Sequence, residues 1–262
     1  MSSTIQFQKW HGSGNDFLLF ERAVFKDGTP KKEEVEKWCN RRTGIGADGL
    51  IVLQPLDQGR VEMQYFNSDG FPGSMCGNGG RCAAKYAFEN GWASAQLLLD
   101  APDGAHIAQD APNGAVVLGM SETPFPEAMC GGYFLDTGSP HLVLSVDLLE
   151  DFNVNGQGRK WRSHERFKPK GTNVNFLEER NGQYFMRTFE RGVEEETLSC
   201  GTGTVAVALV LALQNGWKKG PVTLNAPGGT LTVDFQKTDK GFDSITLSGP
   251  TAQVFSGRLE RG

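Results

Sequence analysis

The segment Cys200–Ala212, CGTGTVAVALVLA, begins with a glycine-rich turn and continues as an unbroken apolar run. It predicts a helix over residues 203–214 that is apolar on every side. Because such a helix has no solvent-facing surface, we expect it inside the fold with strands around it. The longest apolar run, Val205–Leu213, is about half the length of roughly 20 residues that a membrane-spanning helix needs. We therefore interpret it as a buried helix and expect no membrane association.

A second segment, Cys76–Glu89, has the same organisation. Cys-Gly-x-Gly leads into a predicted helix over residues 81–89, which is nearly as apolar. Each predicted helix is followed by Asn-Gly-Trp, then a predicted strand, then a turn that begins with Ala-Pro. The matching segments are 76–79 and 200–203, 90–92 and 215–217, and 101–104 and 226–229. A unit that recurs in the same order predicts two domains built on one plan. The alternative, that these are ordinary helix-end signals, does not account for the two cysteines.

Most of the remaining sequence has strand patterns. Apolar residues alternate with polar ones in short stretches bounded by turn residues. The clearest are residues 61–66, 115–118, 230–233 and 244–247. One more amphipathic helix is predicted over residues 31–41. Pro124 and Pro126 interrupt the pattern, so we place the domain boundary there: residues 1–121 form one domain and 122–254 the other.

The composition limits the possible functions. A chain of 262 residues allows one large domain or two compact ones. Acidic residues (31) outnumber Lys and Arg (26) and no basic run occurs, so nucleic acid is not an expected partner. The first ten residues lack the apolar stretch of a signal peptide, and we expect a cytoplasmic protein. Five cysteines without a secretory signal predict free thiols, and no closely spaced pair predicts a zinc site.

The two repeated cysteines, Cys76 and Cys200, are the candidate catalytic residues. Backbone N–H groups and the helix dipole at a helix start favour a thiolate and can also bind a carboxylate. If the two domains face each other across a cleft, one thiolate can remove an α-proton while the opposite thiol donates one. Backbone donors would stabilise the carbanion without a cofactor, although a pyridoxal phosphate lysine stays open. We expect Cys39, Cys82 and Cys130 to be core or surface thiols.

Six motifs follow one another along the chain: HGSGNDF (11–17), TGIGADG (43–49), FNSDG (66–70) leading to CGNGGRC (76–82), GSPH (138–141), GTNVNF (171–176), and FERG (189–192) leading to SCGTG (199–203). With these motifs in this order, the chain resembles the diaminopimelate epimerases of lysine and peptidoglycan precursor biosynthesis. The resemblance implies an α+β fold. Two pseudo-symmetric domains, each a mostly antiparallel sheet wrapped around a central buried helix, are expected, with a last strand (about 255–262) returning to the first domain.

The resemblance also implies the site. Cys76 and Cys200 correspond to the acid/base pair, His141 and Glu190 to residues that tune the two thiols. Backbone groups of Gly77, Asn78, Gly201 and Thr202 are expected to hold the α-carboxylate. The positions that hold the amino and carboxylate groups of the substrate are Asn15, Asn67, Asn173, Glu190 and Arg191. A small amino-acid substrate and a homodimer follow from the same resemblance, and we expect no cofactor and no metal. His141 could instead be a turn residue, and Glu190 a surface carboxylate paired with Arg191.

Three departures from the family pattern concern the distal end of the substrate. Ser139 stands where many members have Asn before Pro-His. Gly49 stands where some members have a substrate-contacting Gln, so that contact cannot be transferred. One extra residue lies between Arg191 and Cys200 in comparison with some members.

Three other functions compete with this interpretation. A racemase of another amino acid, such as histidine or proline, would use the same scaffold. A cysteine hydrolase would use Cys76 as nucleophile and His141 as base, but would leave Cys200 without a role. A thiol redox or metal-binding module would need closely spaced cysteines, which the sequence lacks.

Overall fold

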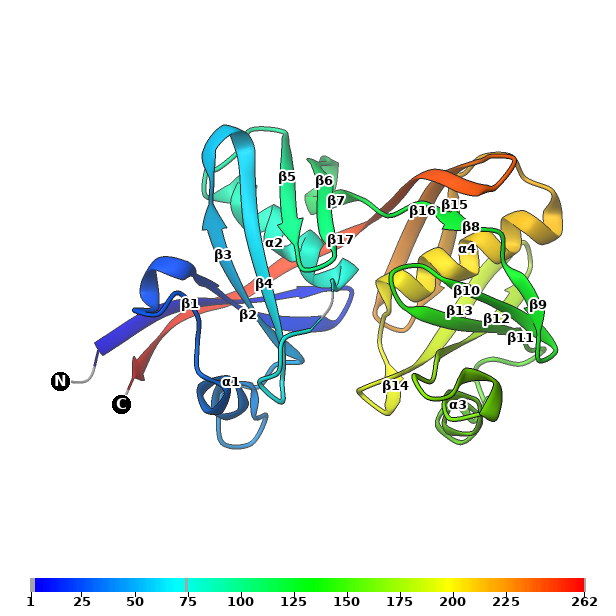
Figure 1. Cartoon of the computed structure of the whole chain (residues 1–262), viewed down its shortest axis with the longest axis horizontal. Helices are drawn as coiled ribbons and strands as arrows, with labels where there is room; N and C mark the ends of the chain where they lie inside the picture. The colour runs from blue at the N-terminus through cyan, green and yellow to red at the C-terminus, as the bar shows by residue number, and fades with distance from the viewer. Residues whose placement is uncertain (1–2, 74, 262) are drawn as a thin grey trace. The chain divides into compact units, whose positions relative to one another are not determined.

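The computed structural model describes residues 3–73 and 75–261, which form a mostly β structure with four α-helices (Figure 1). By its internal contacts the chain divides into two compact units. One contains the chain up to Leu118 and again from Pro250, and the other is Gly119–Gly249. None of the helices in these ranges is long and apolar enough to cross a membrane.

The first unit contains two α-helices and the early strands. Its elements are β1 (Ser3–Gly12), β2 (Asn15–Glu21), α1 (Lys32–Cys39), β3 (Gly49–Pro55), β4 (Arg60–Asn67), α2 (Gly77–Glu89), β5 (Gln96–Ala101), β6 (Gly104–Asp110) and β7 (Ala115–Gly119). The second unit contains β8 (Thr123–Pro124), β9 (Glu127–Met129), β10 (Gly132–Asp136), β11 (Pro140–Ser145), α3 (Val154–Arg162), β12 (Asn173–Arg180), β13 (Gln183–Glu190), β14 (Glu195–Thr197), α4 (Gly201–Asn215), β15 (Val222–Ala226) and β16 (Gly229–Lys237). The long strand β17 (Gly241–Arg261) belongs to both.

The strand pairing repeats between the two units. In the first, β2 and β3 are parallel, β3 and β4 antiparallel, β4 and β5 parallel, and β5 and β6 antiparallel. In the second, β11, β12, β13, β15 and β16 follow the same alternation. The helices α2 and α4 are the crossovers between the parallel strands β4 and β5 and between β13 and β15, which need such a connection. The order of elements inferred from the two cysteine segments is therefore present in the structure.

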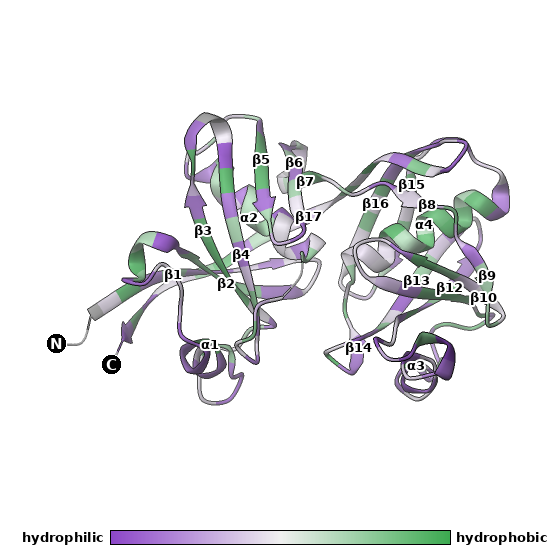
Figure 2. Ribbon diagram, viewed as in Figure 1, coloured by the Kyte–Doolittle hydropathy of each residue, from purple (hydrophilic) through white to green (hydrophobic). Residues whose placement is uncertain are grey.

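Helix α4 forms the core of the second unit. Its residues from Gly203 to Ala212 are all buried, and it packs against β10–β13, β15 and β16. Figure 2 shows hydrophobic residues along most of its surface. The prediction of a buried helix enclosed by strands is confirmed for this segment. Each buried Val or Leu side chain contributes roughly 1.5–3 kcal/mol, so α4 is a principal source of the unit's stability.

Both crossover helices begin earlier than the sequence predicted. Helix α4 starts at Gly201 instead of 203, and α2 starts at Gly77 instead of 81. The glycine-rich segments, which the sequence pattern predicts to be turns, form the first turns of the two helices. Gly203 is needed for close packing, because a Cβ atom there would lie 2.4 Å from Asn175 Oδ1.

Helix α1 is close to its predicted range and covers the core of the first unit. Its Trp38 ring stacks on Phe20 with the ring centroids 5.3 Å apart. Helix α3 was not predicted, because Gly156 and Gly158 weaken its helical pattern. It is capped by Asn153, whose side chain accepts a hydrogen bond from the Gly156 amide at 2.9 Å.

Strand β17 connects the two units. It pairs with β16 as far as Ser248 and with β1 from Thr251 onward. The part that pairs with the first unit therefore begins a few residues before the expected return at about residue 255.

Truncation of a side chain in α4 tests the importance of this core. Leu209 is fully buried, so Leu209→Ala leaves a cavity and should lower the free energy of unfolding by about 2–5 kcal/mol. Leu148 is 74% exposed, and Leu148→Ala should change it by less than about 0.5 kcal/mol. Denaturant titrations of both variants give the comparison. Equal effects would contradict the assignment of α4 as the core helix.

Candidate active site

Cys76 and Cys200 occupy the same position at the start of α2 and α4. Each is the N-cap residue in extended conformation, with φ −111° and ψ 115° for Cys76 and φ −126° and ψ 112° for Cys200. The carbonyl of Cys76 accepts from the Gly80 amide at 2.7 Å, and that of Cys200 from the Thr204 amide at 2.9 Å. The first amides of an α-helix have no acceptor within the helix. Each thiol therefore lies beside N–H groups that favour an anion.

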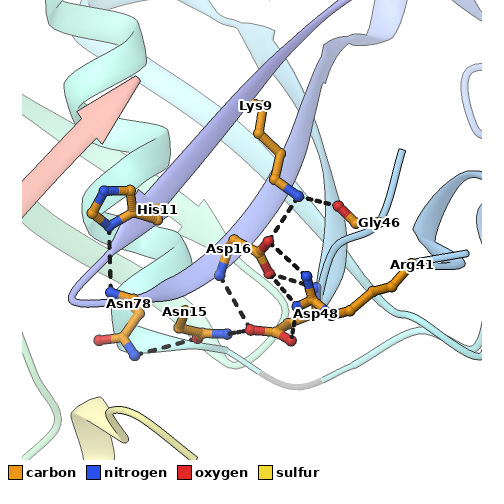
Figure 3. A network of polar contacts seen from close by, with 9 residues as sticks. Lys9, His11, Asn15, Asp16, Arg41, Gly46, Asp48 and Asn78 are labelled. Atoms are coloured by element: carbon orange, nitrogen blue, oxygen red, sulfur yellow. Dashed lines mark hydrogen bonds and ion pairs between the residues drawn. The ribbon is translucent and has the colours of Figure 1, made fainter. Parts of the chain in front are cut away.

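The side chain of Asn15 contacts Cys76 directly. The Cys76 thiol donates to Asn15 Oδ1 at 3.5 Å, and Asn78 Nδ2 donates to the same oxygen at 3.3 Å. Asn15 Nδ2 donates to Asp48 Oδ2 at 2.7 Å (Figure 3). Because an ionised carboxylate only accepts, this bond fixes the orientation of the Asn15 amide. Its oxygen must therefore face the thiol.

A network of charges holds Asn15 in place. Asp16 forms ion pairs with Lys9 and Arg41, both at 2.7 Å, and Arg41 also pairs with Asp48 at 2.6 Å (Figure 3). Burial would raise the pKa of Asp16, but hydrogen bonds from Arg41 and Lys9 outweigh it and lower the pKa to about 2. The carboxylate is thus ionised at neutral pH.

A network of two hydroxyl groups and His141 reaches Cys200 through Thr202. Thr202 Oγ1 lies 3.6 Å from the Cys200 sulfur and 2.9 Å from His141 Nε2. Ser139 Oγ lies 2.9 Å from the same nitrogen and 3.1 Å from Thr202 Oγ1. His141 is thus connected to Cys200 through the Thr202 hydroxyl.

The tautomer of His141 follows from its neighbour Asn175. Asn175 Nδ2 donates to the Leu142 carbonyl at 3.2 Å and faces His141 Nδ1 at 3.1 Å, while its oxygen accepts from Thr188. His141 Nδ1 is therefore an acceptor and the proton lies on Nε2. Burial, followed by the charge of Arg191, lowers the pKa of His141 to about 3. His141 is neutral at physiological pH and donates from Nε2.

Of the other predicted residues of the second unit, Asn173 and Arg191 join the same network, whereas Glu190 contacts Thr197. Asn173 Oδ1 accepts from the Arg191 amide at 2.8 Å, and its Nδ2 donates to the Pro140 carbonyl at 3.0 Å and to Ser139 Oγ at 3.3 Å. The Arg191 guanidinium donates to the Lys170 carbonyl at 3.3 Å. Glu190 accepts a bond from Thr197 at 3.0 Å. The structure thus connects Asn173 and Arg191 with His141.

Asn67 lies at the end of β4 and is exposed. It pairs across the strands with Gly49. A Cβ atom at Gly49 would lie 2.5 Å from the Tyr65 ring, so a longer side chain has no room beside this tyrosine. Tyr65 therefore occupies the space that a Gln side chain at residue 49 would need.

Several residues that build the site were not assigned a role from the sequence. Three of them, Asp16, Asp48 and Asn175, lie inside motifs that were recognised, but their side-chain functions could not be inferred. Lys9 and Arg41 lie outside every motif. Their contacts join residues far apart in the chain, which sequence spacing does not reveal.

The remaining cysteines have no comparable surroundings. Burial raises the pKa of the Cys39 and Cys82 thiols, which are core residues, and Cys130 is half-buried. Within residues 3–73 and 75–261, no group of three or more His, Cys, Asp or Glu side chains could hold a metal ion.

The protonation state of His141 can be tested by ¹⁵N NMR of the imidazole. We expect the neutral tautomer with the proton on Nε2, unchanged between about pH 5 and 8, because burial disfavours the charged form. In Asn175→Asp a carboxylate faces Nδ1, so the proton should move to that nitrogen. Titration of the wild-type ring near its usual pKa of about 6.5 would contradict this assignment.

Comparison with known proteins identifies the family of this chain. The sequence profile named "Diaminopimelate epimerase" matches residues 7–123 and 133–252. A diaminopimelate epimerase of Aquifex aeolicus is 40% identical over 275 residues, covering 97% of this chain and 98% of that protein. One from Flavobacterium psychrophilum is 37% identical over 252 residues, covering 96% and 98%.

Solved structures with low sequence identity share the fold. A Bacillus anthracis phenazine biosynthesis protein of the PhzF family superimposes with a TM-score of 0.75 at 16% identity, covering 98% of this chain and 99% of that one. A hydroxyproline epimerase from Agrobacterium vitis gives 0.71 at 16% identity, covering 98% and 92%. The match of the family profile and the identity to full-length relatives show that this chain belongs to the diaminopimelate epimerase family.

Proposed function

We propose that this chain is an isomerase that interconverts LL- and meso-diaminopimelate by proton transfer between the substrate and two cysteines, Cys76 and Cys200. The observation that carries the proposal is the equal placement of both thiols at the N-caps of α2 and α4. The names of the relatives, which are 37–40% identical over nearly their full length, support the substrate.

In the proposed reaction, one cysteine thiolate removes the α-proton and the electron pair stays on the α-carbon. The other cysteine, as a thiol, donates its proton to the opposite face, and a new C–H bond forms there. The two thiols have then exchanged states, and the reverse reaction restores them. Backbone amides of Gly77, Asn78, Gly201 and Thr202 hold the α-carboxylate and the charge that spreads into it. No cofactor is part of this scheme.

The surroundings of the two sulfurs support these roles. Asn15 Oδ1 accepts a hydrogen bond from the Cys76 thiol. His141 donates from Nε2, which leaves the Thr202 hydroxyl hydrogen available for the Cys200 sulfur. We propose that His141 tunes Cys200 through Thr202, and that Glu190 also tunes the thiols. A hydrolase with His141 as general base is disfavoured, because its Nδ1 lone pair already accepts from Asn175.

We propose that Asn67, Asn173 and Arg191 hold the second amino-acid group of diaminopimelate, and that Asn15 and Glu190 contact the reacting end. Arg191 suits a carboxylate because its planar guanidinium can bind bidentately. Ser139 Oγ lies within hydrogen-bond distance of His141 Nε2, from which it accepts, and of Thr202 Oγ1, so its hydroxyl belongs to the Cys200 network.

The domain organisation, the oligomeric state and the cellular location of the protein are also proposed here. We propose that the two units, which divide at Leu118/Gly119 and Gly249/Pro250, correspond to the two pseudo-symmetric domains expected at 1–121 and 122–254 with a returning strand. We also propose a homodimer in the cytoplasm.

Replacement of either cysteine tests the two-thiol mechanism. Cys76→Ala and Cys200→Ala should each reduce epimerisation by a factor of about 10² or more, because each removes a positioned acid or base. Cys130→Ser should leave turnover unchanged, since this thiol lies outside both networks. Polarimetry or chiral chromatography with LL-diaminopimelate measures the rates. Near-normal turnover in either alanine variant would refute the mechanism.

Substrate discrimination tests the distal contacts. Histidine, proline and lysine lack the hydrogen bonds that the second amino-acid group of diaminopimelate would make with these residues, which should disfavour them by a factor on the order of 10⁴. Arg191→Ala should narrow this gap by reducing kcat/KM for diaminopimelate most. If histidine or proline is racemised as fast as diaminopimelate, the chain is a racemase with another substrate.

A further inference from the structure

Arg81, on α2, is a charged residue that the proposed reaction does not use. Its side chain is fully buried and turns back toward the start of its own helix. The guanidinium donates to the Gly77 carbonyl at 3.3 Å, to Asn78 Oδ1 at 3.0 Å and to Ser13 Oγ at 3.4 Å. All three acceptors are neutral. Because two of them, Gly77 and Asn78, directly follow Cys76, the positive charge lies next to the turn that carries this cysteine.

No carboxylate in the described part of the chain compensates this charge. Among the described residues, no Asp or Glu oxygen lies within 4.0 Å of the guanidinium, and Arg81 Nε has no hydrogen-bond partner. By contrast, Lys85 on the same helix pairs with Asp110 at 2.9 Å. A buried guanidinium without an anion is costly in a protein interior, which points to an anion that this chain presents only in some states.

The charged groups on and next to the strands packed against α2 already have partners other than Arg81. Lys9 contacts Asp16 (2.7 Å), Arg22 contacts Glu62 (2.8 Å), Arg60 contacts Asp100 (2.8 Å), His106 contacts Asp103 (3.0 Å), Tyr86 donates to Glu21 (2.8 Å), and His11 Nδ1 accepts from the Gly14 amide (3.3 Å).

Cys76 is the group that can supply this anion. Burial lowers the pKa of Arg81 to about 10, so it stays charged at neutral pH, and the titratable groups that act on it are Cys82 and Cys76. Cys82 is fully buried, and burial raises its pKa far enough to keep it neutral. Of these two cysteines, Cys76 is therefore the one whose thiolate the charge of Arg81 can favour.

The proposed reaction needs such a charge at this position. Asn15 Oδ1 accepts from the Cys76 thiol, and a hydrogen bond to the neutral form disfavours the thiolate. Cys76 must nevertheless become a thiolate in one direction of the reaction. At Cys200 the Thr202 hydroxyl can donate to the sulfur, whereas Cys76 faces a carbonyl oxygen.

We propose that Arg81 is a positioning residue whose buried charge favours the thiolate of Cys76 and outweighs the effect of Asn15. It also fixes the amide of Asn78: because Oδ1 accepts from Arg81, Nδ2 must face Asn15. Arg81 and Asp48 thus fix both ends of the chain Arg81–Asn78–Asn15–Asp48, from which Asn15 presents its oxygen to Cys76. This role rests on the proposed function of Cys76 as an acid and base.

The test is the pH dependence of Cys76 alkylation by iodoacetamide. The reaction is followed from about pH 5 to 10 by mass spectrometry of the Cys76 peptide, since the thiolate is the reactive form. In Arg81→Gln the midpoint should rise by about one pH unit or more, and Arg81→Lys, which keeps a charge, should restore at least half of that shift. Cys200, measured in the same samples, should keep its midpoint. The control Lys85→Met removes a charge from the same helix and should leave Cys76 unchanged.

An unchanged Cys76 midpoint in Arg81→Gln, or an equal shift in Lys85→Met, would overturn the proposal. If the Arg81 variants do not fold, the unmodified chain decides: the midpoint of Cys76 must lie below the usual thiol pKa of about 8.5, and a value at or above it overturns the proposal. Because alkylation needs no turnover, the result does not depend on epimerase activity. If the Cys76 midpoint shifts in Arg81→Gln but the unmodified chain has no epimerase activity, the proposed function is refuted, whereas the interaction between Arg81 and Cys76 is supported.

Discussion

The burial of two crossover helices is the constraint on which the rest of this structure depends. Helix α4 has no polar face, so its sheet must enclose it, and α2 is buried in the same way from Gly77 to Ala84. The free amides of a buried helix are confined to its first turn. Enclosure therefore makes the N-terminal turn the place where each unit can hold an anion, and each unit has a cysteine at that place.

Placing a thiol at a helix start does not by itself determine its protonation. Around Cys76 and Cys200, amide side chains are held in one orientation by groups that can only accept or only donate. Asp48 orients Asn15, and the Leu142 carbonyl orients Asn175, which in turn determines the tautomer of His141. Such fully connected polar groups are rigid, and rigid donors and acceptors need no reorganisation when charge moves during a reaction. The two sulfurs have different neighbours, an amide oxygen at one and a hydroxyl at the other. Two units with the same strand pairing thus carry two chemically unequal environments.

The sequence was sufficient for the repeat, the burial of α4 and the position of both cysteines, because these depend on local pattern. Apolar periodicity and glycine spacing report on helices and their starts. The sequence did not predict that the first turns of α2 and α4 are helical. The glycines there indicated a turn outside the helix, whereas Gly203 allows close packing inside it. The sequence also missed α3, whose glycines conceal the helix. Lys9, Arg41 and Arg81 could not be assigned, since the roles of buried charges depend on partners distant in the chain. The orientation of an amide such as Asn15 is likewise determined by tertiary contacts alone.

The central claim is that two bases act on opposite faces of one carbon. It is tested most directly by epimerisation of LL-diaminopimelate in D₂O, stopped at low conversion, with the α-deuterium content of product and remaining substrate measured by mass spectrometry. The account predicts deuterium in the newly formed meso-diaminopimelate and almost none in the recovered LL substrate, because the proton removed and the proton delivered occupy different sulfurs. Deuterium entering the recovered substrate as fast as the product would mean that one base serves both faces, and would contradict the account.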